Sequence, residues 1–207
     1  MSCQERNRHK GLHIRNGCMN IASLSRTKAK RVMGIDASTN SIAFTVFYNR
    51  KPERWGKVDI IGGDIYEKIG DANEKIYAIY KQFPVDYVAI EGAAFINSPK
   101  VAVHLAYVYG SIVGVLVAMG CKTITVPAMT WQNFIGNPPF KKPEKEALRL
   151  EYPDKSTSWY STKTRAIRKQ RTMDIFNDKW PLNITDNDVG DSLGIAYYAY
   201  NQLTRRQ

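Results

Sequence analysis

The stretch "RVMGIDASTNSIAFTVFY" (31–48) decides how we expect the chain to fold. Its first part, Val32 to Asp36, is a short apolar run that ends in a carboxylate, and Thr39 and Asn40 are typical turn residues. The second part, "SIAFTVFY", is rich in β-branched and aromatic residues and therefore predicts another strand. Together the two parts predict a β-hairpin whose first strand presents Asp36 at its end.

The segments that follow predict a mixed sheet covered by helices. A third strand is expected in "GKVDIIGG" (56–63), and apolar residues then recur at helical spacing from about 65 to 82. The nearly continuous apolar run "VDYVAIE" (85–91) is typical of a strand buried on both faces. The remaining expected elements are an apolar helix (101–119), a strand (122–126) and a short helix (128–135). This order predicts an α/β fold with a mixed five-stranded sheet and helices on both faces.

The last third of the chain predicts an insertion followed by two helices. Residues 136–162 are rich in proline and are expected to form a long irregular loop, and "KTRAIRKQRTMDIF" (163–176) predicts a basic helix. The final helix lies in "ITDNDVGDSLGIAYYAY" (184–200). Its acidic start has two interpretations at this point: Thr185 and Asp188 form a capping box, or Asp188 and Asp191, three residues apart, share a helix face and hold a metal ion.

The composition favours a basic protein that binds a polyanion. The 207 residues fit one domain with a tail, and the net charge of +11 favours nucleic acid over a membrane surface. Residues 1–31 carry eight Lys and Arg against one acid and are expected to form a flexible basic arm, within which Met19 is an alternative start. Residues 32–207 form the expected folded domain.

The cysteines and the apolar helix bear on where the protein works. Three scattered cysteines favour a reducing compartment, so we expect a cytoplasmic protein of a bacterium or a phage-infected cell, with an organellar matrix as the lesser alternative. The apolar segment 101–119 has the length of a membrane span. A helix buried against a sheet explains the same pattern, and we expect no membrane contact.

Four carboxylates share one property, because each begins or ends a strongly apolar element: Asp36, Glu91, Asp188 and Asp191. Adjacent central strands would bring Asp36 and Glu91 together, and clustered carboxylates repel each other unless cations neutralise them. Two Mg²⁺ ions about 3.5–4 Å apart would do so and would clamp a phosphodiester, with Mn²⁺ as a substitute. Taken singly, each acid is better explained as a strand-end or cap residue satisfied by a backbone N–H or a lysine, but four of them together on a basic chain favour the metal site.

The motifs "GIDAS" (34–38), "AIEGAAF" (89–95) and "DNDVGDSLGIA" (186–196) resemble those of the RuvC-type Holliday-junction resolvases, which have the ribonuclease H-like fold. The resemblance runs from about residue 32 to residue 204. It implies that the four carboxylates are catalytic metal ligands and that Lys163 contacts the scissile phosphate. It also implies that an aromatic residue stacks at the junction, for which Phe95 is the nearest candidate, one place displaced.

The chain also departs from the family pattern. The second active-site lysine of the family is replaced by Trp131, so the missing charge is expected from Lys141, Lys142 or Lys169. Trp131, like Trp159 and Tyr160, is a candidate for stacking on unpaired bases, although such aromatic residues more often belong to the core. The 136–162 insertion is longer than in the short bacterial members, which indicates a phage or other divergent branch.

The resemblance implies a Mg²⁺-dependent endonuclease that resolves four-way DNA junctions as a homodimer by paired nicks, without a small-molecule cofactor. The residues expected to contact DNA are Ser38, Phe95, Arg165, Arg168, Lys169 and Arg171. Three alternatives stay open: a related nuclease acting on other branched DNA or RNA, a non-catalytic junction-binding protein, and an actin-like ATPase suggested by "GIDASTNSIAFTV" (34–46). The last would need a second phosphate loop, for which the chain leaves little room.

Overall fold

The structure is a computed structural model that describes residues 31–92 and 98–204. The predicted basic arm, apart from Arg31, and the junction-stacking candidate Phe95 lie outside the described residues.

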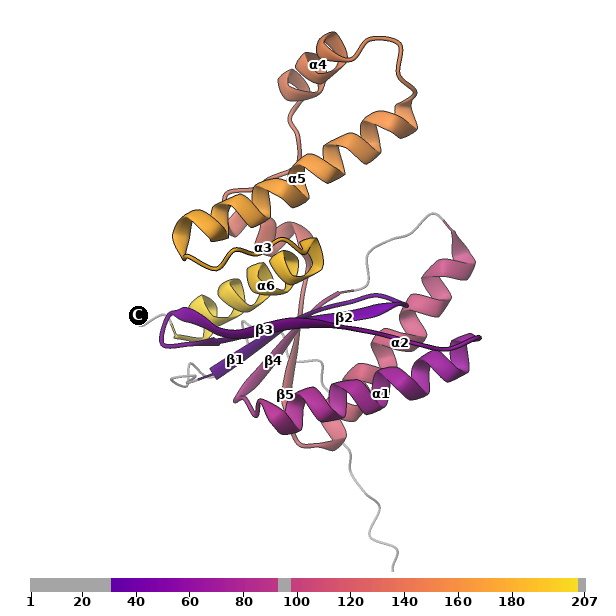
Figure 1. Cartoon of the computed structure of the whole chain (residues 1–207), viewed down its shortest axis with the longest axis vertical. Helices are drawn as coiled ribbons and strands as arrows, with labels where there is room; N and C mark the ends of the chain where they lie inside the picture. The colour runs from indigo at the N-terminus through magenta and orange to yellow at the C-terminus, as the bar shows by residue number, and fades with distance from the viewer. Residues whose placement is uncertain (1–30, 93–97, 205–207) are drawn as a thin grey trace, which may run out of the picture.

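Five strands form one mixed sheet in the order β3-β2-β1-β4-β5 (Figure 1). Strands β1 (Arg31–Ala37), β2 (Ser41–Tyr48) and β3 (Lys51–Asp59) form an antiparallel meander, and β4 (Tyr87–Glu91) and β5 (Lys122–Val126) run parallel to β1. The predicted α/β fold and mixed sheet are therefore confirmed. Strand β3 begins five residues before the predicted 56. Asn49 and Arg50 adopt positive φ angles, and this tight turn lets the polar residues from Lys51 pair at once with β2.

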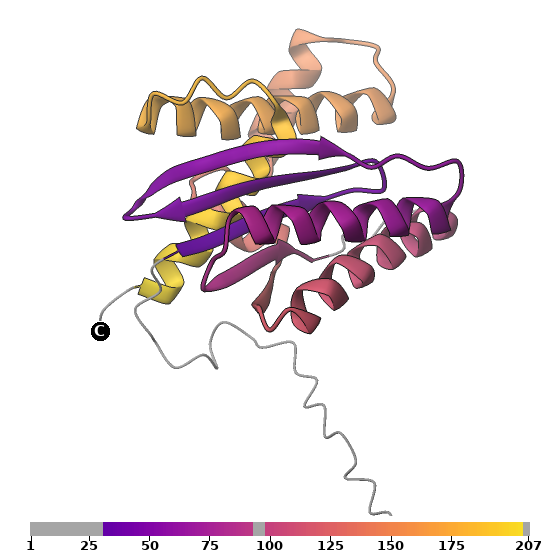
Figure 2. The same cartoon turned by 60° about the horizontal axis from the view of Figure 1, so that its bottom comes forward.

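Helices cover both faces of the sheet. Helices α1 (Ile65–Gln82) and α2 (Pro99–Ala118) lie on one face, and α6 (Asn187–Thr204) lies across the other (Figures 1 and 2). The short α3 (Ala128–Phe134) and the long α5 (Thr157–Lys179) lie on the α6 side. The positions predicted for the helices of 65–82 and 128–135 agree with α1 and α3.

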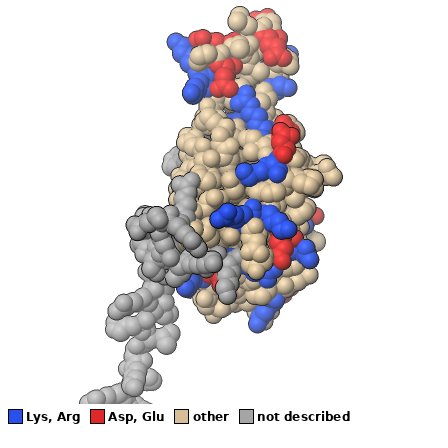
Figure 3. All heavy atoms as spheres, turned by 90° about the vertical axis from the view of Figure 1, so that its left-hand side faces the viewer, with Lys and Arg blue, Asp and Glu red and all other residues tan. Residues whose placement is uncertain are grey.

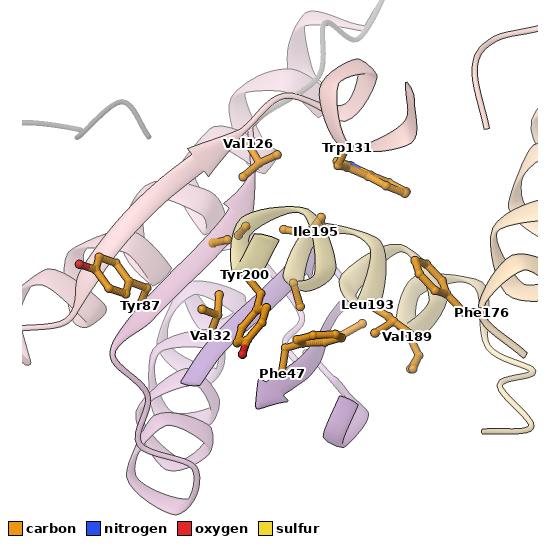
Figure 4. Close-up of a cluster of buried hydrophobic side chains, with 14 of the residues drawn as sticks. Val32, Phe47, Tyr87, Val126, Trp131, Phe176, Val189, Leu193, Ile195 and Tyr200 are labelled. Atoms are coloured by element: carbon orange, nitrogen blue, oxygen red, sulfur yellow. The ribbon is translucent and has the colours of Figure 1, made fainter. Parts of the chain in front are cut away.

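The alternation of side chains along β1 separates two cores. Met33 and Ile35 point into the core shared with α1 and α2. Val32 points to the opposite side, where it joins Phe47, Trp131 and residues of α6 (Figure 4). Because successive strand residues face opposite sides, positions 34 and 36 share the α6 face with Val32.

Helix α6 lies directly on the backbone of β1 at Gly34. A Cβ atom at Gly34 would come closer than 3.0 Å to the Ser192 carbonyl oxygen and the Ala196 nitrogen, which real Cβ atoms essentially never show. A buried hydrogen bond of 2.8 Å between Thr45 Oγ1 and Ser192 Oγ fixes the same turn of the helix to β2. The first turns of α6 are thereby held beside the carboxyl end of β1.

The prediction of an irregular 136–162 insertion is wrong, because this segment contains α4 (Lys142–Glu151) and the first turns of α5. Pro143 lies in the first turn of α4, where a helix needs no N–H donor, so this proline starts a helix. The Glu144 carboxylate accepts a hydrogen bond of 2.9 Å from the Lys141 backbone N–H and so stabilises the N-terminus of α4. Figure 1 shows α4 and the beginning of α5 projecting away from the sheet.

Helix α2 is the one helix in the described ranges that has the length and composition of a membrane span. Val108, Ile112 and Leu116 bury one side of it in the core shared with α1. The expected burial against the rest of the fold is confirmed for this side only, because Val103, Tyr107 and Val117 on the opposite side are 46%, 48% and 51% exposed. Gly110 and Gly114 lie on the exposed side. Among the described residues, no atom lies within 4 Å of a Cβ at either position, so these glycines do not pack against the sheet.

Candidate active site

The structure brings the four predicted carboxylates to one end of the sheet, on the face covered by α6. The parallel register pairs Ile35 with Ile90, so the next residues, Asp36 and Glu91, end neighbouring central strands. Asp188 and Asp191 lie in the first turns of α6, which Gly34 holds against β1. The charges of Asp188 and Asp191 both act on Asp36.

Three of these carboxylates are poorly stabilised in their anionic form. Burial, together with repulsion from Asp191 and Asp188, raises the pKa of Asp36 to about 7. Burial also raises the pKa of Glu91 to about 7 and that of Asp191 to about 6. The protein alone therefore stabilises these groups poorly as anions, and a bound cation would relieve the repulsion.

Asp188 differs from the other three because two lysines bind it. Lys57 Nζ on β3 lies 2.7 Å from Asp188 Oδ2, and Lys169 Nζ on α5 lies 2.8 Å from Oδ1. Burial alone would raise the pKa of Asp188, but the hydrogen bonds from Lys169 and Lys57 outweigh it and lower the pKa. Lys169 also lies 3.7 Å from Asp191 Oδ2. Of the lysines expected to replace the missing family charge, Lys169 is the one found at the carboxylates.

Lys57 was not predicted from the sequence. It lies in a strand that carries several exposed polar residues, and no sequence spacing connects it to an aspartate near the C-terminus. Only the meander, which places β3 near the start of α6, brings it to Asp188.

Trp131 on α3 fixes the orientation of Glu91. Its indole Nε1 donates a hydrogen bond of 2.7 Å to Glu91 Oε2. The ring is fully buried, and a Cβ atom at Gly194 would clash with it, so α6 passes directly over the ring (Figure 4). The expectation that Trp131 stacks on unpaired bases is therefore wrong. A neutral donor now stands where the resemblance placed a lysine.

Asp186, and not a Thr185–Asp188 capping box, caps α6. Asp186 Oδ1 accepts hydrogen bonds from the backbone N–H groups of Asp188 at 2.8 Å and Val189 at 3.2 Å. An aspartate at this position satisfies free N–H groups of the first turn. The capping prediction is wrong in its residues, and the side chain of Asp188 is left to face the site.

The other predicted residues are distributed along α5 and the β1–β2 turn. The Lys163 ammonium lies 5.3 Å from the centre of the Tyr152 ring, whereas the charge of Arg165 acts on Asp36 and Glu91. Ser38 Oγ accepts hydrogen bonds from the backbone N–H groups of residues 40 and 41 and so stabilises the turn.

Two further arginines of α5 have protein partners. Arg168 donates hydrogen bonds to the side chain of Gln132 and to the Asn137 carbonyl oxygen. Arg171 lies 3.2 Å from Glu144 and stacks on Phe140. Contacts of these residues and of Lys163 with DNA stay predictions.

The donor chemistry of the site fits a divalent cation. Carboxylate oxygens are the ligands that Mg²⁺ and Mn²⁺ prefer, and the pKa values of Asp36, Glu91 and Asp191 stay raised despite the nearby charge of Lys169, so a cation would stabilise their anionic forms. Within residues 31–92 and 98–204, no three acidic, His or Cys side chains are arranged to hold one ion.

Comparison with known proteins identifies the fold. No protein-family model and no curated protein sequence matches the chain. Among solved structures, RuvC of Thermus thermophilus in complex with a Holliday junction substrate superposes with a TM-score of 0.59 at 14% identity, covering 83% of this chain and 94% of RuvC. The yeast mitochondrial Holliday junction resolvase Ydc2 gives a TM-score of 0.54 at 10% identity, covering 88% and 83%. The chain therefore has the ribonuclease H-like fold seen in the RuvC-type resolvases.

Proposed function

We propose that this protein is a divalent-metal-dependent endonuclease that resolves four-way DNA junctions by paired symmetric nicks. The observation that carries the proposal is the cluster of Asp36, Glu91 and Asp191, buried together at the end of two central strands in a fold shared with two junction resolvases. Catalytic sites are where burial and like charges raise carboxylate pKa values in this way. The net charge of +11 suits a DNA substrate.

Each residue of the site has a task in this reaction. Asp36, Glu91, Asp188 and Asp191 would hold two Mg²⁺ ions, which supply the charge that activates water and stabilises the leaving oxygen. Trp131 orients Glu91, and the Lys57 ammonium holds Asp188 in place.

Basic residues of α5 would bind the scissile phosphate and balance its negative charge. The Lys169 ammonium, 2.8 Å from Asp188, is positioned to balance negative charge that develops on a phosphate at the cluster. Arg165, whose charge already acts on Asp36 and Glu91, would attract the same phosphate. Lys163 would contact the strand further along the helix, near Tyr152.

A homodimer is part of the proposal, and the exposed side of α2 supports it. Val103, Tyr107, Gly110, Gly114 and Val117 recur every three or four residues and form an apolar stripe along the helix. The helix is apolar by composition, yet one side of it has no packing partner within residues 31–92 and 98–204. Such a side suits a second copy of the chain, with the glycines allowing close approach. A two-fold dimer would present two sites to the two-fold symmetric junction and so cut both strands. Sedimentation showing a fully active monomer at micromolar concentration would contradict the dimer.

The decisive experiment is incubation with a labelled synthetic four-way junction, beside a linear duplex of the same sequence, with Mg²⁺, with Mn²⁺ and with chelator. We expect cleavage of the junction, no comparable cleavage of the duplex, and none in chelator. Mapping both strands should give symmetric nicks. Three-way and flap substrates and an RNA–DNA hybrid separate this function from that of a nuclease for other structures. If the protein binds the junction but does not cleave it in either metal, it is a non-catalytic junction-binding protein and not a nuclease.

A further inference from the structure

A cavity of about 550 Å³ lies beside the carboxylates and extends under the projecting helices. Glu91 and Asp191 line it on the side of the sheet. Lys145 and Arg149 of α4 line it on the side that projects from the sheet (Figure 1). The segment 136–162 is therefore not remote from the active site but forms one wall of a space that opens onto it.

The charge of the cavity wall suits an anion. Its charged lining consists of five basic residues and two acids: Lys145, Arg149, Arg165, Arg168, Lys169, Glu91 and Asp191. In the part of the chain that the structure describes, Lys145 and Arg149 form no ion pair, and Arg149 instead lies 5.8 Å from the centre of the Tyr160 ring. On the face drawn in Figure 3, basic side chains extend from the projecting region onto the body.

Two polar residues of the wall have buried atoms without a partner among the described residues. Asn137 is 3% exposed, and its Nδ2 donates hydrogen bonds to Thr172 Oγ1 at 3.0 Å and to the Arg168 carbonyl oxygen at 2.8 Å. Its Oδ1 and the Nε of Arg168 have no hydrogen-bond partner. These two atoms lie behind the cavity surface, whereas the hydrogen bonds of Asn137 attach the start of the 136–162 segment to α5 and so fix this part of the wall.

We propose that the cavity holds an unpaired sugar–phosphate strand of the substrate next to the scissile phosphate, with Lys145 and Arg149 on its phosphates. The volume falls in the range of about 300–1,000 Å³ that is usual for small-molecule sites, so the cavity has room for one or two nucleotides of a strand. A strand bound there would enter the carboxylate cluster from the side of α4. The proposal rests on the proposed function, because it identifies the strand with the DNA to be cut.

The test is the binding of a fluorescent hexathymidylate to the full chain in chelator, across a range of salt concentrations. The double variant Lys145→Ala/Arg149→Ala should bind about tenfold more weakly. The slope of its log affinity against log salt should fall by about 1.4, because two phosphates of a single strand are no longer neutralised. The control Lys142→Ala/Lys155→Ala removes two charges from the same region but none from the cavity, and it should stay within about twofold of wild type. Lys145→Gln, which keeps the side-chain stem, guards against a folding defect and should give a partial loss.

Equal weakening in both double variants would overturn the proposal, as would tighter binding of a six-base-pair duplex than of the single strand. Junction cleavage in Mg²⁺ separates the cavity assignment from the proposed function. If the protein cleaves the junction but the Lys145→Ala/Arg149→Ala variant binds the single strand as tightly as wild type, the cavity assignment alone is refuted. If the Lys145→Ala/Arg149→Ala variant binds the strand more weakly than the control variant does, but the wild-type protein cleaves no junction, the proposed function alone is refuted.

Discussion

The two faces of β1 meet their helices in different ways. Met33 and Ile35 are apolar, fully buried and separated from α1 and α2 by interlocking side chains. On the other face the strand presents Val32, then a glycine that α6 touches directly, then Asp36. One face stabilises the fold, whereas the other brings helix and strand so close that charged groups from both must share a small buried space. The backbone contact at Gly34 is therefore what brings the aspartates of α6 to the carboxylates at the ends of β1 and β4.

The largest effect is expected from breaking that contact. Gly34→Val would push α6 away from β1, and because the obstructing atoms are backbone, we expect a loss of roughly 4 kcal/mol or more in the free energy of unfolding, or no folded protein. The control on the other side of the sheet is Gly110→Ala, which meets no atom and should stabilise α2 by about 0.5–1 kcal/mol. Urea unfolding followed by circular dichroism measures both. Comparable tolerance at the two glycines would refute the close approach of α6 to β1.

The second prediction compares neighbouring aspartates at the start of α6. Asp188→Asn should reduce junction cleavage by about a hundredfold or more, because it removes a charge that faces the proposed metals. Asp186→Asn should leave cleavage within about threefold of wild type, since Asn caps a helix about as well as Asp. Single-turnover cleavage rates in Mg²⁺ test the pair. Equal losses, or none, would show that Asp188 has no separate role.

A third prediction concerns stability without metal. The pKa of Asp36 is raised to about 7 from an ordinary value of 3.8, so the folded protein binds a proton that the unfolded chain releases between pH 4 and pH 7. Wild type therefore loses stability as the pH rises through that window. Asp36→Asn should be more stable than wild type by roughly 2 kcal/mol at pH 8, and the difference should vanish below pH 4.

Substitution of Asp188 is expected to change the free energy of unfolding in the opposite direction. Its pKa is lowered by its two lysines, so Asp188→Asn should destabilise the protein at pH 8 by about 1 kcal/mol. Denaturant titrations in chelator at several pH values would show both trends. A stability gain for Asp188→Asn, or none for Asp36→Asn, would contradict the charge distribution described for the site.

The smallest effect is expected at Trp131. Trp131→Phe keeps most of the buried ring but removes the hydrogen bond to Glu91. Cleavage should fall about tenfold, in the range typical for loss of a group that orients a ligand. The pKa of Glu91 should rise further, so the rise of activity with pH should move to higher pH, which a purely structural defect would not cause. An unchanged pH profile would argue against an orienting role.

Much of the fold was readable from the sequence because it depends on local patterns. The alternation in 31–48 and the apolar run before Glu91 predicted the central strands, and placing acids at their ends predicted that Asp36 and Glu91 meet. The parts that failed depend on contacts between distant segments. The side-chain environment of Trp131 is set by Gly194, and Lys57 reaches Asp188 only through the meander. Helix α4 was missed because its proline was taken as a loop signal, although at a first turn it favours a helix.

The contact between Trp131 and Gly194 also constrains how such a site arises by single substitutions. Any side chain at position 194 would occupy the space of the indole ring, so tryptophan at 131 is compatible only with glycine at 194. Glycine at 194 beside a smaller or flexible residue at 131 leaves only a cavity, which a folded protein tolerates at moderate cost. The order of change is therefore directional, with the glycine first and the tryptophan second. Once both are present, reversion at 194 is blocked until the tryptophan has gone.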